Sequence, residues 1–162
     1  MVNMLQGKRI LVTGAANGIG RATAMMFQEA GARVAGLDLK DSAAPINIKR
    51  CDLTVEADIV RAVAAAVGEL GGVDVLVNNA GIMQEAAIAA ITAEHIDRHF
   101  AVNVRGVILV TREVLPHLKD GSRIINIASE LAYLGRANAS VYCATKAAIL
   151  GLTRSWAREL AP

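Results

Sequence analysis

Short apolar runs alternate with longer segments of mixed polarity along this chain of 162 residues. The short runs are rich in Val, Ile and Leu, which predicts buried strands over residues 8–13, 33–38, 46–51, 73–78 and 123–128. The longer segments repeat apolar residues every three to four positions, which predicts helices over residues 19–30, 54–70, 92–118 and 142–160. Such alternation favours an α/β domain built on a parallel sheet.

The connections refine this scheme. Thr54 and Thr92 each precede a helical pattern and are expected to be N-caps. Residues 39–45 leave little room for a full helix, and Pro116 should disturb the last turn of the long helix. Because the chain has no internal repeat, linker or low-complexity segment, we expect a single domain over residues 1–162.

Composition excludes several function classes. Seventeen basic and fifteen acidic residues give a net charge of +2, too balanced for a nucleic-acid surface. No apolar run reaches the length of a membrane span, and the N-terminus lacks the pattern of a signal peptide. Cys51 and Cys143 are isolated, so we expect free thiols and a cytoplasmic protein.

A glycine-rich turn follows the first expected strand and opens the first helix. Glycines there allow backbone amides to approach a pyrophosphate at the helix N-terminus. The spacing G-x-x-x-G-x-G departs from the general dinucleotide fingerprint, and a merely structural turn is the alternative. The predicted phosphate-binding residues are Gly14, Asn17, Gly18, Ile19 and Gly20.

Asp38 ends the second expected strand, eighteen residues after Gly20. A carboxylate there can accept hydrogen bonds from the adenosine ribose and would repel a 2′-phosphate, which favours NAD over NADP. Lys40 is a reservation because its charge could attract that phosphate, and a solvated turn aspartate is the alternative interpretation.

Candidate catalytic groups gather near the fifth expected strand. Ser129 follows the apolar run 123–128, so its hydroxyl should emerge at the carboxyl edge of the sheet, where ligands bind. Tyr142 and Lys146 are four residues apart, on one helix face. A neighbouring ammonium favours the phenolate form of a tyrosine, which suits proton transfer at an alcohol or carbonyl oxygen. An ordinary amphipathic helix would explain this pair equally well if it stood alone.

Together these motifs resemble the short-chain dehydrogenase/reductase family. The resemblance rests on TGAANGIG at residues 13–20, NNAG at 78–81, Asn103, Ser129 and Y-x-x-x-K at 142–146. It implies a Rossmann-like, doubly wound parallel sheet in three α/β/α layers, a nicotinamide cofactor, and hydride transfer at a small-molecule alcohol or ketone.

The resemblance also implies individual roles. Tyr142 would be the general acid/base, and Ser129 would polarise the substrate oxygen. Lys146 would hold the nicotinamide ribose and act on Tyr142, while Asn103 would hold a water in the proton relay. The adenosine side of the cofactor would contact Asp52, Leu53, Asn79, Ala80 and Gly81.

The sequence departs from the family pattern after its last helix. Family members continue through a sixth strand, a Pro-Gly turn, a substrate lid and a seventh strand, whereas this sequence ends at Pro162. We therefore expect an unpaired edge at 123–128. Either the sequence covers only part of a longer enzyme, or the chain forms a homo-oligomer over that edge. A nucleotide-binding module without turnover and a structural subunit pairing through its long helices remain as alternatives.

The roles of three further residues, His95, His99 and Glu130, are not settled by the sequence. His95 and His99 have helical spacing that could bind a metal, but the metalloprotease pattern H-E-x-x-H fails because position 96 is Ile. We expect packed or surface histidines and no metal. Glu130 could contact a polar substrate or simply be solvated, and the substrate itself is not defined by the sequence.

Overall fold

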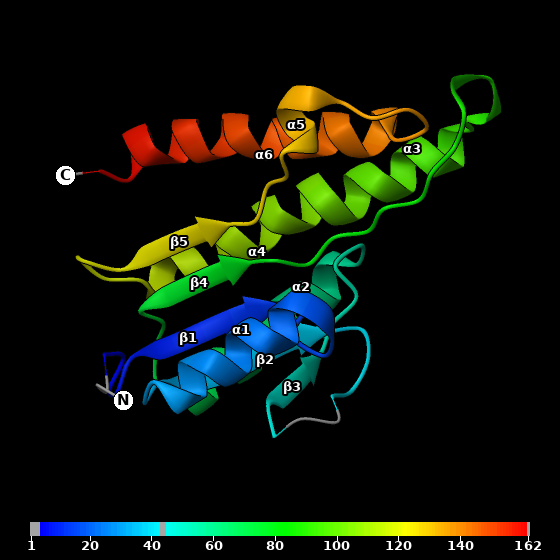
Figure 1. Cartoon of the computed structure of the whole chain (residues 1–162). Coiled ribbons are helices and arrows are strands. Elements are labelled where there is room, and N and C mark those ends of the chain that lie inside the picture. Colours follow the sequence, from blue (N-terminus) through cyan, green and yellow to red (C-terminus); the bar gives the residue numbers. More distant parts are fainter. Residues whose placement is uncertain (1–3, 43–44, 162) are drawn as a thin grey trace.

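The protein contains one five-stranded sheet, seen in a computed structural model that describes residues 4–42 and 45–161 (Figure 1). All strand pairs are parallel, in the order β3-β2-β1-β4-β5. The expectation of a Rossmann-like, doubly wound parallel sheet is therefore confirmed. The strands are β1 Arg9–Thr13, β2 Arg33–Asp38, β3 Asn47–Arg50, β4 Val75–Asn78 and β5 Arg123–Asn126.

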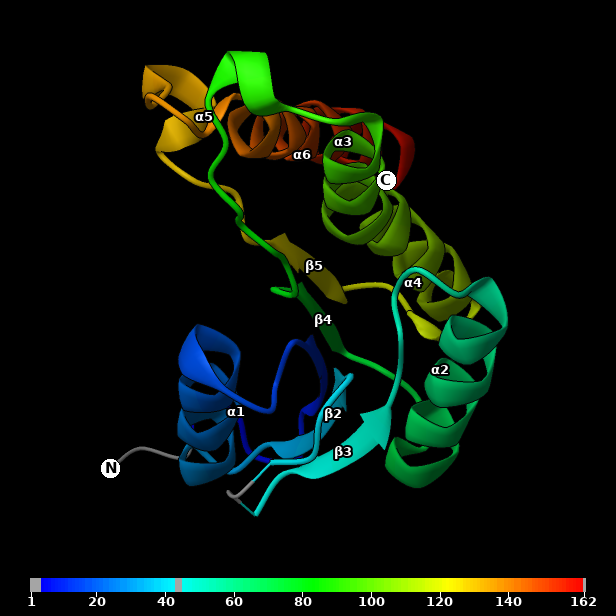
Figure 2. The ribbon, with the colours of Figure 1, turned by 90° about the vertical axis from the view of Figure 1, so that its right-hand side faces the viewer.

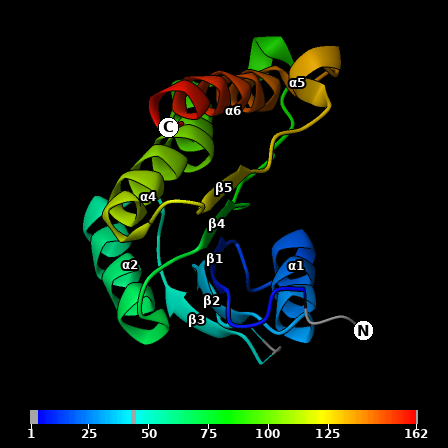
Figure 3. The same ribbon diagram turned by 90° about the vertical axis from the view of Figure 1, so that its left-hand side faces the viewer.

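Helices lie on both faces of the sheet. Helix α1 covers one face, while α2 and α4 cover the other (Figures 2 and 3). Helix α6 packs against α3, η2 and α5. The helical elements are α1 Gly18–Glu29, α2 Glu56–Leu70, η1 Ile88–Ala90, α3 Ala93–Phe100, η2 Ala101–Gly106, α4 Val107–Val114, η3 Leu115–His117, α5 Leu131–Leu134 and α6 Ser140–Glu159.

The strands read as continuous apolar runs because both faces of the sheet are buried. Successive side chains point to opposite faces, so Leu11 and Leu76 pack in the core beneath α2 and α4. Ile10, Val12 and Val77 pack in the core beneath α1. All five side chains are at most 2% exposed, which explains why the strands were recognisable in the sequence.

The two expected threonine caps have different outcomes. Thr92 accepts a hydrogen bond from the His95 N–H at 3.1 Å and caps α3, which confirms that prediction. The prediction for Thr54 is wrong, because α2 starts at Glu56 with Val55 as its N-cap. The N–H and hydroxyl of Thr54 instead donate to Asp52 Oδ1 at 2.8 and 2.7 Å. Asp52 thereby forms an Asx turn over residues 52–54, which places Thr54 before the start of the helix.

The long helix expected over 92–118 is interrupted in the middle. Helix α3 continues into η2, a π-helical segment, before α4 begins, and Pro116 lies in the 3₁₀ turn η3 that ends the run. A π-helical turn is widened by one residue and is common at functional sites. It places the buried side chain of Asn103 toward the loop that follows β4.

The connection between β2 and β3 is short, as expected. Residues 39–42 and residue 45 contain no helix, and residues 43–44 lie outside the described part. No helix within the described residues is long and apolar enough to cross a membrane.

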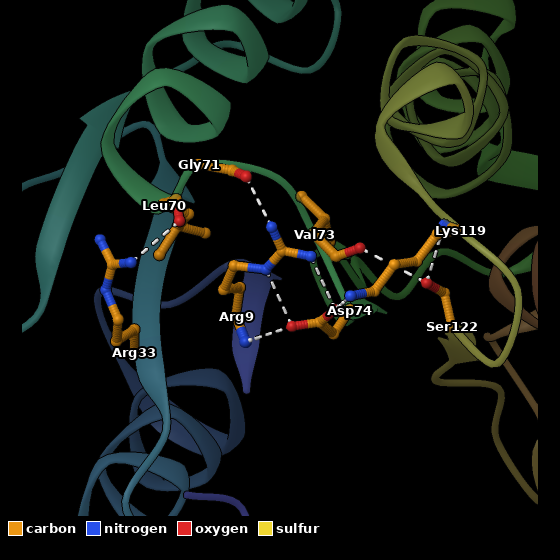
Figure 4. Close-up of polar contacts among 8 residues, drawn as sticks. All are labelled: Arg9, Arg33, Leu70, Gly71, Val73, Asp74, Lys119 and Ser122. Carbon is orange, nitrogen blue, oxygen red and sulfur yellow. Dashed lines mark hydrogen bonds and ion pairs between the residues drawn. The ribbon is translucent and has the colours of Figure 1, made fainter. Parts of the chain in front are cut away.

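A polar network joins the amino ends of the strands, opposite the edge where the strands finish (Figure 4). The Asp74 carboxylate accepts hydrogen bonds from the backbone N–H, Nε and Nη2 of Arg9 at 3.0, 2.9 and 2.8 Å. Arg9 also donates to the Gly71 carbonyl, and Lys119 Nζ lies 3.6 Å from Asp74. The strand expected over 73–78 begins only at Val75, and Asp74 belongs to this network.

Candidate active site

A cleft of about 740 Å³ opens at the carboxyl ends of the strands, where open α/β sheets bind ligands. It lies beside the turn between β1 and α1 and the loop that leaves β4. Every residue expected to contact the cofactor lines it, apart from Tyr142 and Lys146: Gly14, Asn17, Gly18, Ile19, Gly20, Asp38, Asp52, Leu53, Asn79, Ala80 and Gly81.

The glycine turn is tightly packed against this second loop. Gly14 has a φ of +67°, and a Cβ there would lie 2.9 Å from the Cα of Ala80. A Cβ on Gly20 would lie 2.1 Å from the Gly14 carbonyl oxygen. Both positions therefore require glycine, as the spacing in the sequence suggested.

The N-terminus of α1 faces the cleft with its amide groups available. Its N-cap, Asn17, makes no side-chain capping bond within the described structure, and the first turn carries no acidic residue. The first amides of a helix have no partner within the helix, and the helix dipole favours an anion there. The site therefore fits a phosphate-containing ligand.

Thr13 joins the two loops, a role that the sequence analysis did not anticipate. Its hydroxyl accepts hydrogen bonds from the N–H groups of Asn79 and Ala80, both at 3.0 Å. The Asn79 side chain returns a hydrogen bond to the Thr13 carbonyl at 2.9 Å. Only the pairing of β1 with β4 brings these residues together, so no local signal could have revealed the contact.

Asp38 lies at the end of β2 and lines the cleft. Its two carboxylate oxygens accept hydrogen bonds from the N–H groups of Ala16 and Lys40, at 2.9 and 3.0 Å. The carboxylate is thus fixed in place, and it also organises the glycine turn. Lys40 takes part through its backbone N–H, which donates to Asp38. Lys40 is not one of the described residues that line the cleft.

Cys51 also lines the cleft and immediately precedes Asp52 and Leu53 in the sequence. Burial, together with the charge of Asp58, raises the pKa of the Cys51 thiol to about 12. The thiol is therefore protonated at neutral pH and packs as a small apolar group.

Arg98 is the only positively charged side chain among the described residues that line the cleft. It extends from α3, four residues before Val102, which also lines the cleft. Arg98 is not among the cofactor-binding residues predicted from the sequence. The signal that could have revealed it is a basic residue five positions before Asn103, on the same expected helix.

Lys146 and Tyr142 lie on the first turns of α6. Lys146 is only 5% exposed, and its Nζ donates to the Ile127 carbonyl at 2.7 Å. The same Nζ lies 5.8 Å from the centroid of the Tyr142 ring. Burial lowers the pKa of Lys146. The structure therefore brings this pair together, as the four-residue spacing predicted.

Ser129 follows β5 and precedes α5. Its Oγ accepts a hydrogen bond from the Leu131 N–H at 3.2 Å, which fixes the oxygen and leaves the hydroxyl hydrogen free to be donated elsewhere. Glu130 is exposed next to it. The position of Ser129 beyond the carboxyl end of a strand agrees with the sequence analysis.

The side-chain amide of Asn103 binds both the loop after β4 and helix α6. Its Oδ1 accepts from the Ile82 N–H at 2.8 Å, while Nδ2 donates to the Ile82 carbonyl at 2.9 Å and to Thr145 Oγ1 at 3.1 Å. The amide thereby joins η2 to the loop after β4 and to α6. Its part in a proton relay remains a prediction.

The histidine pair is packed together. The rings of His95 and His99 have centroids 4.4 Å apart, and both ring nitrogens of His99 are engaged in hydrogen bonds. Within residues 4–42 and 45–161, no three His, Cys, Asp or Glu side chains form a group that could hold a metal ion.

Comparison with known proteins agrees with this geometry. The sequence profile of the family described as short chain dehydrogenase matches residues 8–162. A sorbitol dehydrogenase from Cereibacter sphaeroides is 43% identical, over 93% of this chain and 64% of its own. The chain thus spans about two thirds of the length of this relative.

Solved structures share the fold. A 3-ketoacyl-(acyl-carrier-protein) reductase from Brucella melitensis, complexed with NADH, superposes with a TM-score of 0.91 at 38% identity, over 98% of this chain and 71% of that one. A short chain dehydrogenase from Burkholderia cenocepacia, in complex with NADP, superposes with a TM-score of 0.90 at 36% identity, over 98% and 70%. The matched profile, these relatives and the shared fold lead to one conclusion: the chain belongs to the short-chain dehydrogenase family of oxidoreductases.

Proposed function

We propose that this protein is an NAD-dependent oxidoreductase that interconverts a secondary alcohol and a ketone. The observation that carries the proposal is the buried Lys146 ammonium. It is held by the Ile127 carbonyl, lies 5.8 Å from the centroid of the Tyr142 ring, and is next to the loop after β4 that lines the cleft. A Cβ built on Gly81 would lie only 3.6 Å from Lys146 Nζ, so the catalytic helix and the cleft meet at this point.

The cleft suits a dinucleotide along its length. The amides at the start of α1 would hold the pyrophosphate, and Arg98 would add a positive charge. Asp38 would accept hydrogen bonds from the adenosine ribose, and Asp52 with Leu53 would lie against the adenine. The fixed carboxylate of Asp38 supports NAD over NADP, because it would repel a 2′-phosphate.

The chemistry follows from three side chains of this chain. A bound nicotinamide supplies the hydride acceptor or donor. Tyr142 takes the proton of the substrate hydroxyl during oxidation and returns it during reduction. Ser129, whose oxygen is fixed by the Leu131 N–H, donates its hydroxyl hydrogen to the substrate oxygen as charge develops there. Lys146 stabilises the phenolate by its charge.

Two further properties belong to the proposal. Strand β5 is one of the two edge strands of the sheet, and its Ile125 is 42% exposed, which supports association into a homo-oligomer. Cys51 and Cys143 are both free thiols, which supports a cytoplasmic location.

The test combines binding with turnover. NADH binding is measured by fluorescence, and turnover is measured with a panel that contains sorbitol and a 3-ketoacyl ester, because the relatives' names indicate these classes. Tyr142→Phe should abolish turnover and leave NADH affinity within a few-fold, because the phenol serves proton transfer. Near-normal turnover by Tyr142→Phe would contradict the assignment. NADH binding without any turnover by the unaltered protein would favour a nucleotide-binding module instead.

A further inference from the structure

A completely buried histidine lies one turn before Asn103. His99, on α3, is 0% exposed, and its Nδ1 lies 2.8 Å from the carbonyl oxygen of His95. Its Nε2 lies 3.1 Å from the backbone nitrogen of Gln84. None of the roles proposed above for the cleft or for catalysis uses this residue.

These two contacts determine which nitrogen of His99 carries the hydrogen. The Gln84 backbone N–H can only donate, so Nε2 must be an unprotonated acceptor. The His95 carbonyl can only accept, so Nδ1 must carry the hydrogen. His99 is therefore the neutral Nδ1–H tautomer, because a hydrogen on Nε2 would face the amide hydrogen of Gln84.

Two side chains of the interrupted helix thus hold one segment of backbone. Asn103 binds both the N–H and the carbonyl of Ile82, and His99 binds the N–H two residues later, at Gln84. These residues continue the loop that begins with Asn79, Ala80 and Gly81 at the cleft. The backbone of residues 82–84 is therefore attached to the helix at two points.

The same segment is also attached on the side of the catalytic helix. The Ala86 N–H donates to the Asn138 carbonyl at 2.8 Å, and Glu85 forms an ion pair with Arg136. Residues 136 and 138 lie in the loop that leads into α6, the helix of Tyr142. Beyond this segment the chain continues into η1. Residues 82–86 thus connect the helix α3–η2 with the loop before Tyr142.

We propose that His99 is a positioning residue: its unprotonated Nε2 fixes the Gln84 backbone and so holds residues 82–86 in the conformation that links the cofactor cleft to the catalytic loop. The inference rests on the proposed function, since it assigns His99 to the same site. Asn103 fixes one point of the segment, and His99 fixes the second, without which the backbone between Ile82 and Ala86 could move.

The first test needs no substitution. A long-range ¹H–¹⁵N NMR spectrum of the 162-residue chain distinguishes the imidazole tautomers. The expected result for His99 is a protonated Nδ1 and an unprotonated Nε2, together with slow hydrogen exchange of the Gln84 amide. A protonated Nε2, or a Gln84 amide that exchanges as fast as an unstructured one, would overturn the proposal.

The second test compares two variants. His99→Gln can place an amide oxygen near the position of Nε2, whereas His99→Leu fills a similar volume without any acceptor. We expect Gln84 amide exchange to rise by about fivefold or more in His99→Leu and to stay near the original rate in His99→Gln. NADH affinity should fall several-fold in the leucine variant only. Exchange of the core amides of β1 shows whether either variant has lost its fold.

The outcomes separate this proposal from the proposed function. If the original protein does not bind NADH, the proposed function fails, while the tautomer and the exchange rates still judge the role of His99 in positioning the backbone. If it binds NADH and His99→Leu binds NADH equally well with a freely exchanging Gln84 amide, the positioning role is wrong. The positioning role is supported if His99→Gln keeps both the slow Gln84 exchange and the NADH affinity while His99→Leu loses them. If His99 only filled space, the leucine variant would keep both as well.

Discussion

Replacing Asp74 by Asn should destabilise the protein without affecting the cleft. The Asp74 side chain is 11% exposed and that of its partner Arg9 is 20% exposed, so water compensates poorly for the loss of the pair. The three hydrogen bonds that Asp74 accepts from Arg9 join the starts of β1 and β4. Asparagine keeps the size and one acceptor oxygen but removes the negative charge, and it leaves the guanidinium facing an amide.

The magnitude follows from the burial of the pair. Removing one partner of a fully buried pair costs about 3–5 kcal/mol, whereas exposed pairs contribute about 0–1 kcal/mol. Because Arg9 keeps its hydrogen bond to Gly71 and is partly exposed, we expect a loss of about 2–3 kcal/mol in the free energy of unfolding. The matched control is Glu56→Gln, which breaks the exposed pair with Arg112 and should cost less than about 1 kcal/mol.

The effect should depend on pH with a defined sign. Arg9 holds the pKa of the Asp74 carboxyl well below its usual range. A carboxyl whose pKa is lowered on folding contributes stability above its unfolded pKa of about 3.9, and that stability is lost as the pH falls below this value. The difference between the original protein and Asp74→Asn should therefore be complete at pH 7 and should shrink in acid.

Urea unfolding at several pH values, followed by circular dichroism, measures this difference. NADH affinity serves as the second readout and should be unchanged, because the network of Figure 4 lies at the amino ends of the strands and the cleft lies at their carboxyl ends. A loss below about 0.5 kcal/mol at pH 7 would refute the reasoning on burial. A difference that persisted unchanged in acid would refute the reasoning on the ionised carboxylate.

Two predictions concern the cofactor cleft. Asp38→Ala should relax discrimination against NADPH by one to two decades, since repulsion between close charges near a surface is about 1–4 kcal/mol, and Asp41→Ala is the exposed control. An original protein that already prefers NADPH in a binding titration would contradict this role of Asp38. Arg98→Gln should weaken binding of ADP several-fold and leave adenosine unchanged, because only the diphosphate carries charge, with Arg154→Gln as the control on α6. Equal losses for ADP and adenosine in calorimetry would contradict this role.

Three features could be predicted from the sequence because each leaves a local pattern. These are the positions of the strands along the chain, the glycine turn, and the shared helix face of Tyr142 and Lys146. Strands buried on both faces leave continuous apolar runs. Gly14 and Gly20 are required by contacts within one turn or between adjacent loops. A four-residue spacing on a helix brings two side chains to one face wherever the helix lies. The glycine turn and Asp38 were also predicted from local patterns and line the cleft, whereas Asp52, Leu53, Asn79, Ala80 and Gly81 were expected from the family resemblance.

Tertiary structure decided what depends on partners distant in sequence. Thr54 is a local exception: Asp52, two residues earlier, binds its N–H and hydroxyl in a turn, and the helix begins only after Val55. The π-helical interruption, the inclusion of Arg98 in the cleft and the tautomer of His99 all arise where α3 and η2 meet the loop after β4. The sequence pattern of an amphipathic helix is the same whether or not another backbone packs against it. The hydrogen-bond partners of the side chains on its buried face are therefore set by the fold.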